Sequence, residues 1–238
     1  MDAAALLERI AAEPERAAIL LDVDGVLAPI VDVPAAAAVP EETRTELRRL
    51  HARYALVGCV TGRTADEARR IVGLDELVYV GEHGLELVPE AAEWRERLRV
   101  FADTVGWDDA ERKPLTVSFH YRRNPDEGAA LRLLTAVAEA ATEAGLIPRF
   151  GRKVLEIRPP LDAHKGTAVT HLLHERGLRR ALFAGDDTTD LDAFAALAEL
   201  ELGVRVAVAS AEAPPGLREA ADLVVGSPAE LLGVLRRL

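Results

Sequence analysis

A pair of acidic residues follows an apolar segment near the start of this 238-residue chain. Asp22 and Asp24 come directly after the apolar run 17–21 and are followed by Gly25. Residues two apart in a strand point the same way, so a bend at the glycine would let both carboxylates face one reacting centre. An ordinary strand-ending turn would show the same pattern. The pair indicates a reacting centre only when it is considered together with other segments.

Three more acidic residues follow a second apolar run, 181–184. They are Asp186, Asp187 and Asp190. Carboxylates this close repel one another unless something positive lies between them. Hard oxygen ligands at this density indicate Mg²⁺, which usually keeps waters and bridges to a substrate phosphate. The alternative is a group that caps a helix, but a cap needs one acid rather than three.

Two further segments could hold phosphate oxygens. Thr61, Gly62 and Arg63 follow a buried apolar run and precede a helix start, where a hydroxyl and free backbone N–H groups suit a phosphate. Lys165 stands at the head of another predicted helix and could supply positive charge. Taken alone, the first could be a capping turn and the second an exposed lysine. All four segments, however, lie at the ends of predicted strands of one sheet, in one order.

The elements that must position these segments alternate between strand and helix. Compact apolar runs are typical of strands buried on both faces of a parallel sheet, and they lie at 17–22, 54–60, 77–80, 181–184, 204–208 and 223–225. The helices predicted between and around them lie at 2–12, 40–52, from 64 onward, 165–176 and up to the last residue. This order predicts an α/β fold with a doubly wound parallel sheet, in which ligands bind at the carboxyl ends of the strands.

The middle of the chain has a different pattern. We predict a charged helix, a half-exposed strand, a second helix and two paired strands, at 91–112, 115–121, 125–144, 146–150 and 154–158. Half-exposed strands with helices on one side describe a small α+β unit. The predicted organisation is therefore a core of residues 1–90 and 162–238, with an inserted unit of residues 91–161.

Composition excludes several classes of protein. With 40 acidic against 29 basic residues the chain carries a formal charge of −11, which argues against a nucleic-acid partner. One cysteine, Cys59, excludes a disulfide framework, and we expect it in the strand core. No run approaches the ~18 apolar residues of a membrane span, and the first residues lack a basic signal-peptide region. We therefore expect a cytoplasmic protein.

With these four segments the chain resembles the haloacid dehalogenase superfamily of phosphohydrolases. More narrowly it is similar to the trehalose-6-phosphate phosphatase family. The segments that carry this narrower resemblance are 22–30, 81–86, 153–159, 185–190 and 192–194. The resemblance spans nearly the whole chain. It implies a Rossmann-like catalytic core and makes the inserted unit a cap that closes over the sugar.

The resemblance also implies a role for each segment. Asp22 would be the nucleophile that forms an aspartyl-phosphate, and Asp24 the general acid and then base. Thr61 and Lys165 would hold the phosphoryl oxygens. The residues implied to bind Mg²⁺ are Asp22, Asp24 through its backbone carbonyl, Asp186, Asp187 and Asp190.

The sugar contacts are the least specified part of the resemblance. Our candidates from the core are Gly62, Arg63 and His83, and those from the cap are Lys153, Glu156, His120 and Arg122. The cap residues also have simpler interpretations: Glu156 could belong to a solvated strand face, and Arg122 could simply be a polar residue. Two positions depart from the family: Val26 replaces a common threonine, and Leu191 stands where we expect glutamate. The second departure bears on the substrate more than on the chemistry.

The sequence thus predicts an Mg²⁺-dependent phosphatase of trehalose biosynthesis. Its substrate would be a small sugar phosphate, trehalose 6-phosphate, and we expect a monomer with no nucleic-acid or membrane partner. The alternatives are a phosphatase for sucrose 6-phosphate or mannosyl-3-phosphoglycerate, a phosphomutase, and a non-catalytic sugar-phosphate sensor. A signalling receiver domain is disfavoured, because the acidic pair follows the first strand and an insert is present. Three histidines, His164, His171 and His174, lack an acid or cysteine to complete a metal set, so we expect them at the surface.

Overall fold

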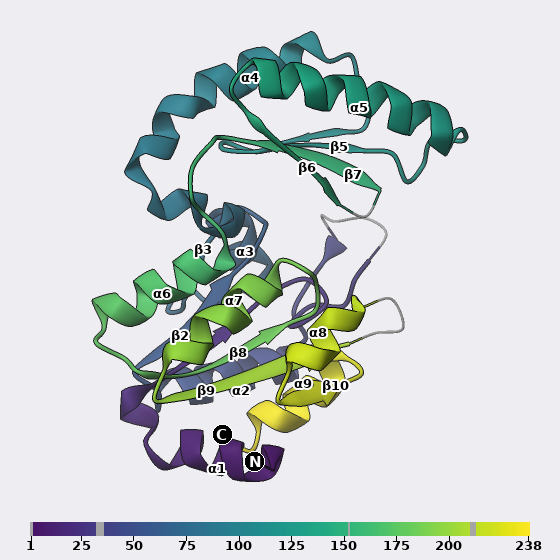
Figure 1. The fold of residues 1–238 in the computed structure, drawn as a ribbon. Helices are drawn as coiled ribbons and strands as arrows, with labels where there is room; N and C mark the ends of the chain where they lie inside the picture. The colour runs from purple at the N-terminus through teal and green to yellow at the C-terminus, as the bar shows by residue number, and fades with distance from the viewer. Residues whose placement is uncertain (1, 32–35, 152, 210–212) are drawn as a thin grey trace. The chain divides into compact units, whose positions relative to one another are not determined.

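The computed structural model of the chain describes residues 2–31, 36–151, 153–209 and 213–238 (Figure 1). The chain divides into a core unit, Met1–Gly84 with Ala163–Leu238, and an inserted unit, Leu85–Asp162. The sequence placed these boundaries at 91 and 161. The inserted unit begins earlier because a 3₁₀ turn, Pro89–Trp94, leads directly into its first helix.

The core unit is built on a parallel sheet of six strands. They are β1 (Ala17–Leu21), β2 (Leu56–Val60), β3 (Val78–Val80), β8 (Arg180–Gly185), β9 (Leu202–Val208) and β10 (Leu223–Val225). Their order in the sheet is β10-β9-β8-β1-β2-β3, and every neighbouring pair is parallel. All residues of β1, β2 and β8 are buried, which explains why these strands have continuous apolar sequences.

Helices cover both faces of this sheet. They are α1 (Ala3–Ala12), α2 (Glu41–His51), α3 (Ala65–Val72), α6 (Lys165–Glu175), α7 (Asp190–Ala196), α8 (Pro215–Ala220) and α9 (Pro228–Leu235). Ile19 and Cys59 pack in one layer with apolar residues of α1, α2, α3 and α9. Phe183 points the other way and meets Phe194 of α7 edge to face, with the ring centroids 6.2 Å apart. The predicted doubly wound α/β core is confirmed.

Local sequence explains where the helix after β2 begins and ends. The Thr64 hydroxyl accepts from the Glu67 N–H at 3.2 Å, and the Glu67 carboxylate accepts from the Thr64 N–H at 3.2 Å. This reciprocal capping box satisfies two backbone donors at the start of α3. The helix ends at Gly73, whose φ of 71° is left-handed, a conformation that glycine adopts without strain.

The inserted unit has an antiparallel sheet with helices on one face. Its strands are β4 (Ala110–Arg112), β5 (Val117–His120), β6 (Ile147–Gly151) and β7 (Val154–Arg158), in the order β4-β5-β7-β6. Its helices are α4 (Arg95–Thr104) and α5 (Glu127–Glu143). Phe119 and Leu155 pack with apolar residues of both helices. Because side chains alternate along a strand, Ser118 and Glu156 lie on the opposite face, which we call the open face.

The predicted helix 91–112 was wrong in its second half. Helix α4 ends at Thr104, and Ala110–Arg112 instead pairs with β5 as strand β4. Gly106 follows the end of the helix and interrupts the helical pattern. The short polar segment after it carries no apolar alternation, which is why periodicity did not reveal a strand there.

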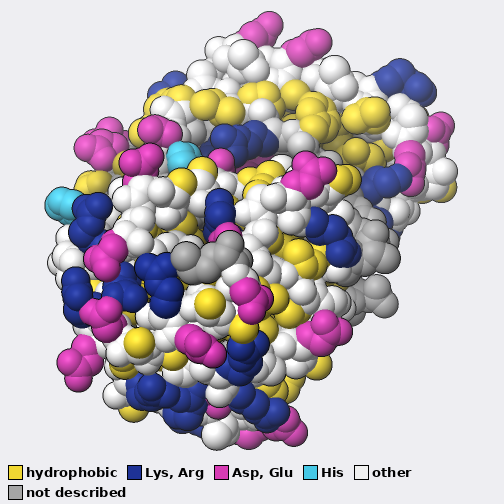
Figure 2. All heavy atoms as spheres, turned by 60° about the horizontal axis from the view of Figure 1, so that its bottom comes forward, with side chains coloured by type: hydrophobic (Ala, Val, Ile, Leu, Met, Phe, Trp, Pro, Cys, Tyr) yellow, Lys and Arg dark blue, Asp and Glu magenta, His cyan; other side chains and the backbone are white. Residues whose placement is uncertain are grey.

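Charged side chains of both signs intermingle on the surface drawn in Figure 2. In the core unit, Arg48 bonds to Glu41 at 3.0 Å and Arg236 bonds to Glu42 at 3.2 Å. Within residues 2–31, 36–151, 153–209 and 213–238, no helix has the length and apolar character needed to cross a membrane.

Candidate active site

Three adjacent strands of the core unit deliver polar residues to the same edge of the sheet. Asp22 directly follows β1, Thr61 follows β2 and Asp186 follows β8. Strands β8, β1 and β2 are neighbours, so their carboxyl ends lie together. This edge of an open parallel sheet is where such folds bind ligands.

A buried lysine joins two of the carboxylates. Lys165, the first residue of α6, places its Nζ 2.7 Å from Asp22 Oδ2 and 2.7 Å from Asp190 Oδ1. The side chains of Lys165 and Asp190 are 1% and 0% exposed. A buried ammonium is tolerated only when paired. Although burial lowers the pKa of Lys165, the charges of Asp190 and Asp22 raise it well above its usual range.

The loop after β8 is shaped around Asp190. Its Oδ2 accepts the backbone N–H groups of Asp186 at 2.8 Å and of Asp187 at 3.0 Å. A Cβ atom on Gly185 would lie 2.3 Å from the Asp190 Cβ, so no other residue type fits there without movement. Asp190 therefore pairs with the Lys165 ammonium through one carboxylate oxygen and holds the backbone of Asp186 in place through the other.

The predicted bend after Asp24 is present. Gly25 has a φ of 73°, and a Cβ atom there would lie 2.1 Å from Asp186 Oδ2. The glycine thus provides a left-handed turn and at the same time leaves room for the carboxylate of Asp186. The two acidic segments, far apart in sequence, approach each other at this position.

Within the part of the chain that the structure describes, one group of carboxylates could hold a metal ion: Asp22, Asp186 and Asp190. Each offers an oxygen, and these oxygens lie within 4.8 Å of one another. Burial, opposed in part by the charge of Lys165, raises the pKa of Asp22 to about 6. Burial and the charges of Asp22 and Asp190 raise the pKa of Asp186 to about 8. Three carboxylates against one ammonium leave a surplus of negative charge, which suits a divalent cation bound by oxygen.

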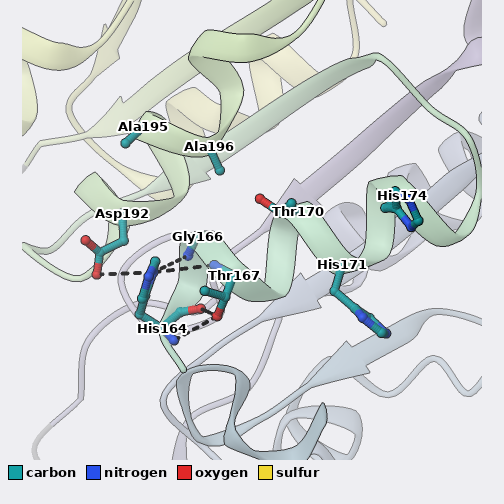
Figure 3. Close-up of a pocket in the computed structure, with 9 residues that line it drawn as sticks. All are labelled: His164, Gly166, Thr167, Thr170, His171, His174, Asp192, Ala195 and Ala196. Atoms are coloured by element: carbon teal, nitrogen blue, oxygen red, sulfur yellow. Dashed lines mark hydrogen bonds and ion pairs between the residues drawn. The ribbon is translucent and has the colours of Figure 1, made fainter. Parts of the chain in front are cut away.

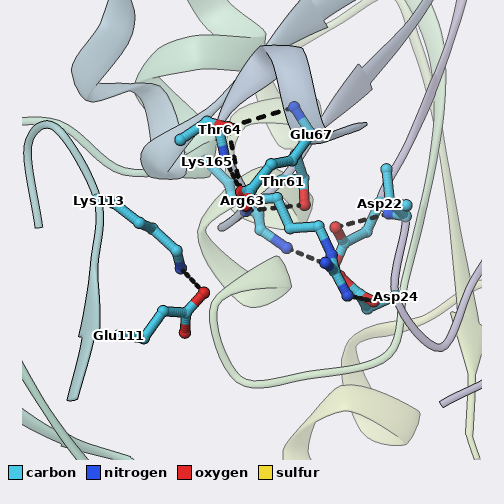
Figure 4. Close-up of polar contacts among 10 residues, drawn as sticks. Asp22, Asp24, Thr61, Arg63, Thr64, Glu67, Glu111, Lys113 and Lys165 are labelled. Carbon is cyan, nitrogen blue, oxygen red and sulfur yellow. Dashed lines mark hydrogen bonds and ion pairs between the residues drawn. The ribbon is translucent and has the colours of Figure 1, made fainter. Parts of the chain in front are cut away.

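Two of the predicted metal residues lie outside this group of carboxylates. Asp187 is exposed, and it joins the loop through its backbone: its N–H donates to Asp190 Oδ2, and its carbonyl accepts the Asp190 N–H at 3.1 Å. The carboxylate of Asp24 bonds instead to Arg63, from Nε to Oδ2 at 2.6 Å and from Nη2 to Oδ1 at 2.7 Å (Figure 4). Our prediction for Asp24 in metal binding concerned only its backbone carbonyl.

The pairing of Asp24 with Arg63 connects the segments after β1 and β2. We expected Arg63 to contact the sugar. In the structure its guanidinium forms two parallel hydrogen bonds with the carboxylate of Asp24. The backbone N–H of Arg63 also donates to Thr61 Oγ1 at 3.3 Å. The turn after β2 therefore presents a buried hydroxyl and orients the second acidic residue.

His83 folds back onto the same turn. Its φ of 56° is left-handed, and its backbone N–H donates to the Thr61 carbonyl at 2.9 Å. A Cβ atom on Gly62 would lie 2.6 Å from His83 Nε2, so the ring stands directly against this glycine. The structure thus brings Thr61, Gly62, Arg63 and His83 together.

The four candidates from the inserted unit are separated. His120 and Glu156 belong to the open face, where Glu156 is paired in register with Ser118. Lys153 lies in the β6–β7 turn with a φ of 60°, and its Nζ bonds to Glu127 of α5. Arg122 is exposed in the turn after β5. Two of the four therefore share a surface.

The open face also holds residues that we did not predict. Glu111 Oε2 lies 3.2 Å from His120 Nε2. Glu111 Oε1 lies 3.5 Å from Lys113 Nζ, a contact drawn in Figure 4. The hydrogen bond from His120 and the charge of Lys113 lower the pKa of Glu111 to about 2. Because we assigned 91–112 to a helix, this strand was overlooked. The i, i+2 spacing of the two charged residues was the available signal.

Comparison with known proteins places the chain in a family. The trehalose-phosphatase profile matches residues 20–111 and 109–221. "Probable trehalose-phosphate phosphatase G" of Arabidopsis thaliana is 29% identical over 239 residues, which cover 84% of this chain and 63% of that protein. An "Uncharacterized glycosyl hydrolase" of Mycobacterium tuberculosis is 34% identical over 218 residues, or 80% of this chain and 16% of that protein.

Among solved structures, the crystal structure of a trehalose-6-phosphate phosphatase related protein is similar, with a TM-score of 0.75 and 25% identity. It aligns over 92% of this chain and 95% of that one. The chain spans less than two thirds of the length of either curated relative described above. The family resemblance seen in the sequence is confirmed, and this chain belongs to the trehalose-phosphatase family.

Proposed function

We propose that the protein is an Mg²⁺-dependent phosphatase that hydrolyses trehalose 6-phosphate to trehalose and phosphate. One observation carries this proposal: Lys165 bridges Asp22 and Asp190 at 2.7 Å each, beside the carboxylate of Asp186. A nucleophilic carboxylate that attacks a phosphate dianion needs positive charge on both sides. The lysine supplies part of it, and the surplus of carboxylates suits a cation that supplies the rest.

In this mechanism Asp22 is the nucleophile. The Val23 N–H donates to Asp22 Oδ1 at 2.7 Å and Lys165 bonds to Oδ2, so both oxygens are held in place. A carboxylate oxygen of Asp22 forms a bond to phosphorus while the bond from phosphorus to the sugar oxygen breaks. Water then cleaves the aspartyl-phosphate. Thr61 and Lys165 hold phosphoryl oxygens during both steps.

Asp24 acts as the general acid and then as the general base. It gives a proton to the leaving sugar oxygen and later takes one from the attacking water. The two bonds from Arg63 fix the plane of its carboxylate beside the turn that carries Thr61. We propose that Arg63 orients Asp24, and the sugar contact expected from the sequence stays a prediction.

Asp22, Asp186 and Asp190 are the side chains that would hold Mg²⁺, together with the backbone carbonyl of Asp24. When bound, the ion supplies positive charge that offsets the repulsion between the nucleophile and the phosphate. Burial, followed by the charges of Asp22 and Asp190, raises the pKa of Asp186 to about 8, and a bound cation would favour its charged form.

The open face of the inserted unit carries side chains that can bind the hydroxyl groups of a sugar. Glu111, Ser118 and Glu156 form a row across three strands, since each is paired in register with the next. Ionised carboxylates accept hydrogen bonds from sugar hydroxyls. We propose that this row recognises the sugar. The names of the relatives favour trehalose 6-phosphate among sugar phosphates; cytoplasmic location and a monomeric state stay predictions from the sequence.

The test is phosphate release with Mg²⁺ from a panel of trehalose 6-phosphate, sucrose 6-phosphate, glucose 6-phosphate, mannosyl-3-phosphoglycerate and p-nitrophenyl phosphate. We expect a strong preference for trehalose 6-phosphate. Asp22→Asn should lower kcat by at least about 10³-fold, since it removes the nucleophile. Asp66→Asn is a matched control, because Asp66 is an exposed residue of α3 paired with Arg69.

The outcomes separate the parts of the proposal. Turnover of another member of the panel would keep the mechanism and reject the substrate. Activity that survives Asp22→Asn would reject the nucleophile. No Mg²⁺-dependent release from any member would reject the phosphatase and favour a non-catalytic sugar-phosphate sensor.

A further inference from the structure

His164 is not simply a surface histidine, as the sequence suggested. Its side chain is 32% exposed and forms the N-cap of α6, the helix whose first residue is Lys165. His164 Nδ1 accepts the backbone N–H of Gly166 at 3.2 Å and that of Thr167 at 3.4 Å (Figure 3). A nitrogen that accepts two N–H groups carries no proton. His164 Nδ1 therefore acts as an acceptor in this cap.

The cap is reciprocal. Thr167 Oγ1 accepts the backbone N–H of His164 at 3.0 Å and donates to the His164 carbonyl at 2.9 Å. Side chain and backbone of both residues thus close the first turn of α6 from two directions. The conformation of this turn determines where the side chain of Lys165 begins.

The same turn packs directly against α7. A Cβ atom on Gly166 would lie 2.4 Å from the carbonyl oxygen of Asp192 and 2.9 Å from His164 Cε1. Asp192 Oδ2 is 3.8 Å from His164 Nδ1, too far for a hydrogen bond, so this nitrogen stays with the helix N–H groups. On the other side, a Cβ atom on Gly84 would lie 3.1 Å from the His164 carbonyl. His164 is therefore held between two segments of the core unit.

Helices α6 and α7 each begin with a residue of the site. Lys165 opens α6 and Asp190 opens α7, and the 2.7 Å contact between them joins the two first turns. The imidazole of His164 lies at one end of a groove of about 520 Å³ between these helices. A loss of the cap would let the first turn of α6 unwind and shift the buried lysine.

We propose that His164 is a positioning residue that sets the location of the Lys165 ammonium between Asp22 and Asp190. It acts through the cap on α6, as an acceptor for backbone N–H groups, and not by contact with the substrate. This role rests on the proposed phosphatase function, in which Lys165 offsets the charge of the phosphate.

Two substitutions at His164 separate capping from other effects. His164→Ala removes the acceptor, whereas His164→Asn keeps one, because the Asn Oδ1 occupies nearly the place of His Nδ1 and asparagine is a strong N-cap. Ser227→Ala is the matched control. Ser227 caps α9 through a bond from the Glu230 N–H at 3.2 Å, and it belongs to no part of the proposed site.

We would measure kcat, KM and Tm for the three variants on the best substrate of the wild-type protein with Mg²⁺. His164→Ala should lower kcat about 10- to 100-fold, since small displacements of a catalytic group have effects of this size. His164→Asn should restore kcat to within about threefold of wild type, as one expects if the cap alone is responsible. Ser227→Ala should lower Tm as His164→Ala does and leave kcat unchanged.

The proposal is wrong if His164→Ala and Ser227→Ala lose the same Tm and both keep the wild-type kcat. It is also wrong if His164→Asn folds but has a kcat as low as that of His164→Ala. If the wild-type protein releases no phosphate, the phosphatase function fails, and a crystal structure of His164→Ala still decides the positioning role. We expect Lys165 Nζ to leave hydrogen-bond distance of Asp190. An unmoved lysine would reject the role of His164.

Discussion

The core unit and the inserted unit each place a lysine beside carboxylates, but the two surroundings have opposite effects. Lys165 is buried and lies 2.7 Å from two aspartates, and burial raises the pKa of Asp22 to about 6. Lys113 lies 3.5 Å from Glu111, which is 41% exposed and whose pKa falls to about 2 through hydrogen bonding to His120. In the core, desolvation dominates; on the open face, favourable local contacts dominate.

This difference indicates that the core unit carries out the chemistry and that the inserted unit recognises the substrate. A desolvated group of like charges repels itself until a cation binds, which suits chemistry at a fixed point. The row on the open face consists of two partly exposed glutamates with a buried serine between them, and acceptors of this kind suit the recognition of hydroxyl groups. The comparison predicts that substitutions in the core alter stability and kcat, while substitutions on the open face alter KM.

The largest contrast should come from removing the two lysines. Lys165→Met leaves Asp22 and Asp190 buried without their ammonium, so we expect the free energy of unfolding to fall by about 3–5 kcal/mol and kcat by at least about 100-fold. Lys113→Met removes one partner of a longer, 3.5 Å pair whose carboxylate is 41% exposed, and it should cost less, about 1 kcal/mol. Chemical denaturation without metal, together with phosphate release, measures both variants.

The comparison fails if both lysine variants lose similar stability. It also fails if Lys165→Met keeps wild-type kcat, because the ammonium would then have no part in the reaction. Methionine is chosen at both positions since it preserves the length and apolar character of the side chain and removes only the charge.

Much of the core could be predicted from sequence because its signals are local. Continuous apolar runs marked the strands Ala17–Leu21 and Leu56–Val60, and the spacing of Thr64 and Glu67 marked the start of a helix. Parallel strands bring their carboxyl ends to one edge, so residues that follow them converge without any knowledge of side-chain packing. The approach of Asp22 to Asp186 followed from that rule.

What could not be predicted depends on pairs that are distant in sequence. Arg63 and Asp24 are 39 residues apart, and nothing local distinguishes an arginine that orients a carboxylate from one that binds a sugar. His164 is an exception, because its cap partners Gly166 and Thr167 are only two and three residues away, and we missed the cap because histidine is not among the usual N-cap residues. Strand β4 was not predicted for a related reason: a short polar edge strand forms because a partner strand pairs with it, and its own sequence shows no periodicity.

A smaller effect is expected on the open face. Glu111→Gln and Glu156→Gln remove acceptor charge from the proposed sugar row, so each should raise KM for trehalose 6-phosphate about tenfold, as one lost hydrogen bond to a charged group would. On p-nitrophenyl phosphate, which has no sugar, neither variant should differ from wild type by more than about twofold.

Steady-state kinetics on the two substrates checks this prediction, and Glu96→Gln, an exposed surface change on α4, serves as the control. A fall in kcat on both substrates would mean that the open face takes part in the chemistry. The distinction between the two units would then be wrong.

The smallest effect concerns the pH dependence of stability. The pKa values of Asp22 and Asp186 are raised to about 6 and about 8 from an ordinary 3.8, so the folded metal-free core holds protons that the unfolded chain releases. Their contribution to stability is therefore present at low pH and is lost as pH rises through 6 to 8. The lowered pKa of Glu111 acts in the opposite sense, and its contribution is lost only as pH falls from 4.5 toward 2.

Of these three carboxylates, then, only the two in the core should respond between pH 5.5 and 8.5. Mg²⁺ replaces the protons on these carboxylates, so it should raise Tm by a few degrees more at pH 8.5 than at pH 5.5. Thermal unfolding with Mg²⁺ and with EDTA at both pH values measures this difference, and Asp186→Asn should reduce it because the group with the higher pKa is gone. A gain in Tm that is the same at both pH values would show that the repulsion among the core carboxylates is not what the cation relieves.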